Sequence, residues 1–298
     1  MPRLATALKI LRAIIRNPRS LARLIDQETE FKNYVIAAYG FESGLPTIDL
    51  LDLLPGAEET VEPYSFLEGG SYPSDLALLK GLVRRYELKN YLEIGTWRGE
   101  SVANVATVAE KCVSLRLSDE EMRQKHLSHL IGVHDFYSRN LPNVTHIYHN
   151  SESFDFSSLG EKYDLIYIDG SHDYRNTKND TRNAFTLLKA ERSVIVWHSY
   201  GLSTERTRWS SLAGILDGCP ANKRNNLYHV SNTKCAIYIQ DKFQTKCVPF
   251  PAVPDKNFRI KLSAAPIRPP PRPLVSGRGS GSLRSEGDPQ RFKAESSK

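Results

Sequence analysis

Residues 91–99 read YLEIGTWRG, a short apolar run that leads directly into an acid and two spaced glycines. A buried strand ending at Gly95 and a helix beginning near Arg98 predict the nucleotide pocket of an open α/β sheet. Glycine lets the backbone approach a ligand closely, and a helix N-terminus presents unpaired N–H groups. Glycine spacing alone is weak evidence, but its weight rises because further strand–helix units follow it along the chain.

The rest of the chain alternates between apolar runs and helical patterns, which predicts an α/β fold with a mostly parallel sheet covered on both faces. The expected parallel strands are 90–94, 112–117, 144–148, 163–168 and 193–197. Two later runs, 226–230 and 235–239, flank a polar turn and predict an antiparallel hairpin. The expected helices are 75–88, 100–110, 119–140, 174–188 and 209–216. Ligands of such sheets bind at the carboxyl ends of the strands, so the residues after each strand are the candidates.

Composition places the chain among globular proteins with one substantial core, since it has 298 residues of which 40% are hydrophobic and 25% charged. No apolar run approaches the roughly 18 residues needed to cross a bilayer. The four cysteines lack the spacing of metal ligands, so neither a zinc site nor a disulfide framework is expected. A reducing compartment follows, and we expect a cytoplasmic location.

The net charge of +6 is concentrated at the two ends of the chain. Residues 1–25 carry six basic residues and no acid, and residues 259–298 carry nine basic residues and three acids. The part between them holds 25 basic and 31 acidic residues. Nucleic-acid binding needs a clustered basic face, so nucleic acid is not an expected partner of this body. The basic ends remain able to contact an anionic surface.

Three regions are expected. Residues 1–73 hold an amphipathic helix over 3–25, followed by a linker or lid over 40–73. Residues 74–258 form the main α/β domain, and 259–298 are a disordered basic tail rich in Pro, Gly and Ser. The first helix either packs on its own domain or docks on a membrane or partner. A transit peptide is also an open interpretation, whereas the apolar core of a secretory signal is lacking.

The segment after the fourth parallel strand carries the second chemical signal. The run DLIYI at 164–168 leads into Asp169, and His172 follows three positions later. A carboxylate at a strand tip can bind a cation or a ligand hydroxyl, and histidine suits proton transfer near neutral pH. His198 follows the next strand, so the three residues suggest a metal site or an acid–base pair. The structural alternatives are a turn or helix cap for Asp169 and an exposed loop histidine for His172.

On these motifs, residues 70–240 resemble a class I S-adenosylmethionine-dependent methyltransferase. The nearest resemblance is to the small bacterial group (methyltransferase family 24 type) related to catechol O-methyltransferase and cephalosporin hydroxylase-like proteins. The matching stretches are LEIGTWRGES at 92–101, HNSESF at 149–154, YDLIYIDGSHDY at 163–174 and VIVWHSY at 194–200. The resemblance implies a Rossmann-like, doubly wound, seven-stranded sheet of order 3-2-1-4-5-7-6 with the last strand antiparallel. It also implies that 74–258 transfers a methyl group from S-adenosylmethionine to an oxygen, or with less support a nitrogen, of a small molecule or sugar.

The resemblance implies roles for individual residues. The cofactor-binding set is Glu93, Gly95, Thr96, Trp97, Gly99, Ser101, Asp119, Asn150, Ser151 and Asp169. Within that set, Glu93, Gly95, Trp97 and Ser101 match positions around the methionine part, and Asn150 and Ser151 match positions near the adenine. Asp169 matches the acid that ligates a divalent cation in metal-dependent relatives, so the resemblance also implies a Mg²⁺ site at Asp169 and His198. His172 stands where those relatives have a general-base lysine, which makes His172 and Asp169 the implied catalytic residues.

Several positions depart from the family pattern. Arg116 stands where relatives place the acid that binds the ribose hydroxyls, and Asp119 is the candidate substitute. Losing that acid removes charge-assisted hydrogen bonds worth about 1.5–3 kcal/mol. Asn150 and Ser199 replace two further acids. A second candidate function is therefore a catalytically degenerate protein of this fold with a binding or scaffolding role.

A nicotinamide-dependent oxidoreductase is a third interpretation, but it usually requires three glycines in GxGxxG, and this chain has only Gly95 and Gly99 here. The choice of methyl acceptor is expected to lie in loops such as 40–73 and 199–210.

Overall fold

The computed structural model describes residues 27–248 and 250–267. The helix expected over 3–25 and the part of the expected tail from 268 onward lie outside the described residues. Contacts within the chain divide it into two units, Met1–Val253 and Pro254–Lys298. The described part of the second unit forms neither helix nor strand. Among the described residues, no helix combines the length and apolarity needed to cross a membrane.

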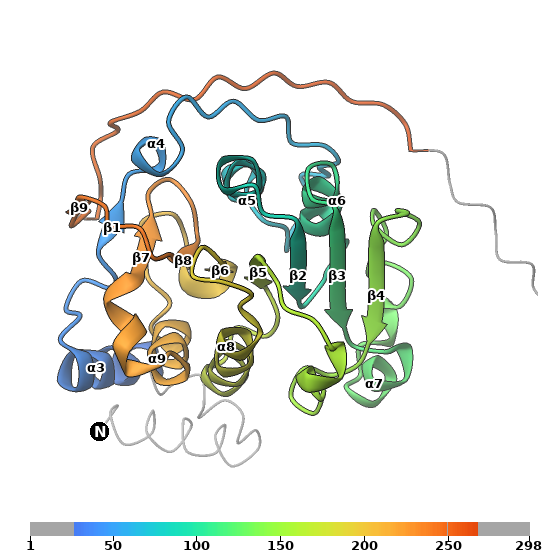
Figure 1. Ribbon diagram of the computed structural model, residues 1–298, viewed down its shortest axis with the longest axis horizontal. Helices are drawn as coiled ribbons and strands as arrows, with labels where there is room; N and C mark the ends of the chain where they lie inside the picture. The colour runs from blue at the N-terminus through green and yellow to red at the C-terminus, as the bar shows by residue number, and fades with distance from the viewer. Residues whose placement is uncertain (1–26, 249, 268–298) are drawn as a thin grey trace, which may run out of the picture. The chain divides into compact units, whose positions relative to one another are not determined.

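The described residues of the first unit form a nine-stranded sheet with the order β4-β3-β2-β5-β6-β8-β7-β1-β9 (Figure 1). The strands are β1 (Thr47–Ile48), β2 (Asn90–Ile94), β3 (Lys111–Arg116), β4 (Val144–Tyr148), β5 (Leu165–Ile168), β6 (Val194–Trp197), β7 (Leu227–Val230), β8 (Ala236–Tyr238) and β9 (Thr245–Lys246). Strands β2 to β6 run parallel to their neighbours among themselves, and β8 is antiparallel to both β6 and β7.

The predicted fold class is confirmed. Strands β2 to β8 follow the implied order 3-2-1-4-5-7-6, and the last of them is the antiparallel one. The strand count differs, because β1 and β9 extend the sheet beyond β7. Each has only two residues, which is too short a run to show the alternation by which strands are recognised in a sequence.

Helices cover both faces of the sheet, with α5 and α6 on one face and α3, α8 and α9 on the other (Figure 1). The described α-helices are α3 (Gln27–Tyr39), α4 (Leu50–Leu53), α5 (Pro73–Tyr86), α6 (Glu100–Ala106), α7 (Asp119–Gln124), α8 (Tyr174–Leu187) and α9 (Trp209–Gly218). Four 3₁₀ helices lie at Ser128–Leu130, Phe156–Leu159, His198–Tyr200 and Ala221–Asn226. Each face of the sheet has its own hydrophobic core, so Leu92 and Ile94 of β2 pack on one side and Tyr91 on the other.

The helix predicted over 119–140 is wrong in its length. Helix α7 ends at Gln124, and irregular turns and a 3₁₀ helix follow up to residue 140. His126 and Asp135 have positive φ angles of 61° and 55°, and Gly132 has one of 87°. A residue with positive φ cannot continue a right-handed helix. The segment instead folds back over the start of α6, which brings it to the candidate site.

Candidate functional site

The carboxyl ends of β2 and β5 meet in direct backbone contact. Gly95 has a φ angle of 92°, and a Cβ atom at this position would collide with the backbone of Gly170 and lie 2.5 Å from the carbonyl oxygen of Asp169. The Asp169 N–H donates to the carbonyl oxygen of Ile94 at 2.9 Å. Only glycine fits such a close approach at positive φ. The first and third motifs of the sequence therefore lie side by side.

Glu93 lies beneath this turn as a fully buried acid. Its two carboxyl oxygens accept hydrogen bonds from Tyr91 Oη at 2.7 Å and from Thr96 Oγ1 at 2.8 Å. The Ser101 hydroxyl on α6 also hydrogen-bonds to it. Burial outweighs these hydrogen bonds and raises the pKa of Glu93 to about 7. Glu93, Thr96 and Ser101, all predicted as cofactor contacts, thus form one internal cluster that holds the turn.

The loop between β2 and α6 is covered by the irregular segment that follows α7. The N–H groups of Asp135 and Tyr137 donate to the carbonyl oxygens of Trp97 and Arg98 at 2.8 and 2.9 Å. Gly99 has a φ angle of 79°, and a Cβ there would lie 3.0 Å from Ser138 Cβ. The Trp97 ring packs edge-on against His134, and its Nε1 is buried without a hydrogen-bond partner.

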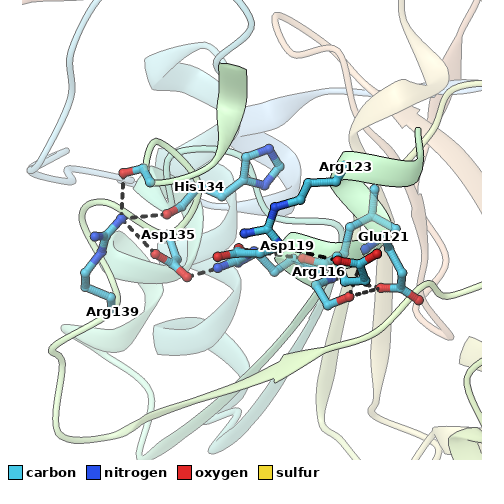
Figure 2. Close-up of polar contacts among 11 residues, drawn as sticks. Arg116, Asp119, Glu121, Arg123, His134, Asp135 and Arg139 are labelled. Carbon is cyan, nitrogen blue, oxygen red and sulfur yellow. Dashed lines mark hydrogen bonds and ion pairs between the residues drawn. The ribbon is translucent and has the colours of Figure 1, made fainter. Parts of the chain in front are cut away.

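Arg116 joins three segments at the carboxyl end of β3 (Figure 2). Its Nε donates to Asp135 Oδ2 at 3.0 Å, and its Nη1 donates to the Leu117 carbonyl at 2.7 Å and lies 3.3 Å from Asp119 Oδ1. Arg139 pairs with the other oxygen of Asp135 at 3.0 Å. The Asp119 side chain remains 47% exposed. The arginine at the expected acid position is thus a structural link that also holds Asp119 in place.

The predicted adenine contacts follow β4 and are fixed by two helices. Glu121 Oε1 accepts from the Asn150 N–H at 2.9 Å, while Glu121 Oε2 closes the capping box of α7 with Ser118. The Ser151 carbonyl accepts from Asn179 Nδ2 on α8 at 3.1 Å. Sequence reasoning missed Glu121, although the S-x-x-E spacing from Ser118 is a recognisable capping signal.

His198 lies between two carboxylates. Its Nδ1 is 2.8 Å from Asp169 Oδ1, and its Nε2 is 3.2 Å from Asp75 Oδ2. Asp75, fully buried at the start of α5, also accepts from the N–H groups of Tyr72 and Lys234. Burial lowers the pKa of His198, but the nearby charges of Asp169 and Asp75 and their hydrogen bonds prevail and raise it to about 9. Sequence reasoning missed Asp75, because an acid in a first helical turn is ordinary capping chemistry.

The metal site expected at Asp169 and His198 is not supported by this geometry. Both ring nitrogens of His198 face carboxylates, so the pair forms a buried ion pair and leaves no nitrogen free to ligate. Across the described ranges, no group of three or more His, Cys, Asp or Glu side chains is placed to hold a metal ion. The Mg²⁺ assignment is therefore not carried further.

His172 lies just before α8 and keeps part of its surface exposed to solvent. Its carbonyl oxygen accepts from Ser211 Oγ at 3.0 Å, which ties the loop to α9. Desolvation of the ring lowers the pKa of His172, and although the charge of Asp169 opposes this, those of Arg208 and His198 add to it. The lowered pKa favours the neutral imidazole, which is the form that a proton acceptor needs.

A cavity of about 480 Å³ lies at the other end of the sheet. It is lined by 40–47, Tyr200, 203–207, His229 and 245–248. Both loops expected to govern acceptor choice contribute to it, but none of the predicted cofactor residues does.

Residues 92–200 match the model of a family described as a methyltransferase domain. The matched range contains both the Gly95 turn and the Asp169 segment of the candidate site. The chain is similar to a putative O-methyltransferase from Klebsiella pneumoniae (18% identity, 59% of this chain and 84% of that one, TM-score 0.39). It is also similar to an O-methyltransferase from Bacillus cereus in complex with SAH (16% identity, 67% and 81%, TM-score 0.34).

A third similar structure is a cofactor-bound protein, Rv0187 from MTB (20% identity, 44% of this chain, TM-score 0.34), and the match spans only 57% of that protein's length. No curated protein matches the chain. Because the structural similarities are low, the function of this chain has to be inferred from the family match and from its own residues.

Proposed function

We propose that this protein transfers a methyl group from S-adenosylmethionine to a hydroxyl oxygen of a small molecule or sugar. The main support is the contact of Gly95 with the Asp169–Gly170 backbone inside the segment that matches the methyltransferase family. The residues also fit the cofactor, because positive-φ glycines line the turn and Trp97 Nε1 is buried with its hydrogen-bonding capacity unused. A buried polar atom without a partner costs free energy that a bound ligand can recover.

The proposed cofactor-binding residues follow three strands, and each group of residues contacts a different part of the cofactor. Gly95, Trp97 and Gly99 border the methionine part, with Glu93, Thr96 and Ser101 holding the turn from below. Asp119, positioned by Arg116, takes the ribose hydroxyls. Asn150 and Ser151 border the adenine. When bound, the cofactor supplies an electrophilic methyl group on its sulfonium centre.

The chain's own residues then handle the acceptor proton. The neutral His172 imidazole accepts the proton of the acceptor hydroxyl, so that its oxygen becomes nucleophilic as it meets the methyl group. Asp169, held at one oxygen by His198, stays anionic, and its charge favours the imidazolium that His172 becomes when it takes this proton. Asp75 acts through His198 and is a positioning residue.

Two measurements test this proposal: calorimetric titration with S-adenosylmethionine, and methyl transfer to a panel of hydroxylated metabolites with and without a chelator. We expect micromolar binding and turnover that the chelator does not abolish. The variant His172→Ala is expected to keep the affinity for the cofactor and to lose turnover. Equal turnover in this variant would remove His172 from the mechanism.

The second candidate is a catalytically degenerate protein with a binding role, and Arg116 at the expected position of the ribose acid favours it. The same titration separates the two candidates, because a degenerate site would not bind the cofactor even at millimolar concentration. The cytoplasmic location and the contact of the basic ends with an anionic surface stay predictions.

A further inference from the structure

Asp180 is a buried acid on α8 that no step of the proposed mechanism uses. It is 1% exposed, and its Oδ2 has no hydrogen-bond partner. Its Oδ1 lies 3.5 Å from Asn179 Nδ2, a long and weak contact. A carboxyl oxygen that is buried and unpaired is costly in free energy, so it calls for a donor that is not part of the chain.

The unpaired oxygen lies between the tips of β4 and β5. A Cβ atom on Gly170, directly after β5, would be 3.5 Å from Asp180 Oδ2. On the other side, the Ser151 hydroxyl after β4 hydrogen-bonds to the Asp180 carboxyl, and Asn179 donates to the Ser151 carbonyl. Asp180 therefore lies at the carboxyl end of the sheet, next to the backbone contact between Gly95 after β2 and Gly170 after β5. This contact is called the seam between β2 and β5.

The surroundings of Asp180 argue against a simple structural ion pair. The charges that act on its carboxyl are those of Glu152 and Asp173, which are both acidic. Burial raises the pKa of Asp180 to about 7, and the hydrogen bonds from Ser151 and Asn179 only partly offset it. A carboxyl in this setting accepts a hydrogen bond from a neutral N–H donor in either protonation state.

We propose that Asp180 recognises the exocyclic amino group of the cofactor's adenine through Oδ2, with Ser151 orienting its carboxyl. The inference rests on the proposed function, since only that function places an adenine here. Above its pKa, the Asp180 carboxylate accepts a hydrogen bond from an amino N–H, whereas a 6-oxo purine sets its own oxygen against the carboxylate and leaves two acceptors facing each other. Below that pKa, the protonated carboxyl donates to the 6-oxo oxygen and the discrimination is lost. Asp180 is thus a specificity-determining residue that separates adenosyl from inosyl ligands.

The test compares two probes, S-adenosylhomocysteine and S-inosylhomocysteine, titrated calorimetrically into the full-length protein at about pH 8.5, above the pKa of Asp180. The wild type is expected to bind the adenosyl compound at least about tenfold more tightly, because the inosyl compound leaves a buried acceptor unpaired. In Asp180→Asn this ratio falls to about one or inverts, since the amide can turn its NH₂ group toward the 6-oxo oxygen. Glu110→Gln, which removes an exposed carboxylate paired with Lys89, is the matched control and keeps the wild-type ratio.

The outcomes separate the inference from the function on which it rests. If the wild type binds neither probe, the proposed function fails. If the wild type binds both probes equally, or if Asp180→Asn keeps the wild-type ratio of affinities, Asp180 does not recognise the adenine amino group. The proposed function would still stand in that case. Thermal unfolding of each variant checks its fold. Should Asp180→Asn be unfolded, Ser151→Ala provides the second measurement: a lowered ratio supports the assignment, and an unchanged ratio overturns it.

Discussion

Replacing Arg116 with glutamine tests whether the arginine at the expected acid position is a structural link. Arg116 is 9% exposed, and it pairs at 3.0 Å with Asp135, whose side chain is 4% exposed. Breaking a buried ion pair costs about 3–5 kcal/mol. Arg139 remains on the other oxygen of Asp135, which places the expected loss at the lower end. The pair with the half-exposed Asp119 adds at most about 1 kcal/mol. We therefore expect Arg116→Gln to lower the free energy of unfolding by about 3 kcal/mol.

Urea unfolding followed by circular dichroism measures this loss. The matched control is Arg123→Gln, which removes an arginine paired with Glu120 at 3.3 Å where both side chains are more than half exposed. The control should change the free energy of unfolding by less than about 0.5 kcal/mol. At a temperature where both variants are folded, only Arg116→Gln should weaken S-adenosylhomocysteine binding, because Asp119 loses the partner that positions it. A loss of stability no larger than that of the control would refute the structural role of Arg116.

Two further predictions concern the turn at Gly95 and the carboxylate of Asp217. Gly95→Ala should lose several kcal/mol of stability or fail to fold, because its Cβ would strike the Gly170 backbone at a positive φ. Gly170→Ala should be tolerated, because its Cβ would meet Asp180 only at 3.5 Å. Thermal unfolding compares the two variants, and equal stability would contradict the close approach of Gly95 and Gly170. Asp217 accepts hydrogen bonds from Tyr39, Tyr174 and Lys178, and although burial opposes it, these bonds lower the pKa of Asp217 to about 2. The stabilisation by Asp217 is therefore present above its unfolded-state pKa near 3.8 and is lost as the pH falls toward 2. In urea unfolding, the difference in the free energy of unfolding between wild type and Asp217→Asn should narrow between pH 5 and pH 2. A constant difference would rule out this linkage.

The sequence was most informative where local pattern and tertiary structure agree. Buried parallel strands appear as continuous apolar runs, so β2, β5 and β6 could be recognised within two residues of their ends. The glycine at 95 and the acid at 169 could be placed together, because parallel strands bring their carboxyl ends to one edge.

The remainder depended on contacts between distant segments. Asp75 pairs with His198 only after α5 has packed against the sheet, and nothing near Asp75 in the sequence signals it. Likewise, the partner of Arg116 is Asp135, in a segment whose composition resembles a helix but whose positive φ angles exclude one. Asp180 could not be singled out in the sequence of a polar helix, because its burial arises only when the helix packs in the folded structure.

A crystal structure of the protein grown with saturating S-adenosylhomocysteine tests the central claim most directly. We predict density for the ligand over the seam between β2 and β5, with its homocysteine part at Gly95 and Trp97 and its adenine amino group at Asp180. Density for the ligand in the cavity beside Tyr200, or an empty seam at a ligand concentration that saturates binding, would contradict the account.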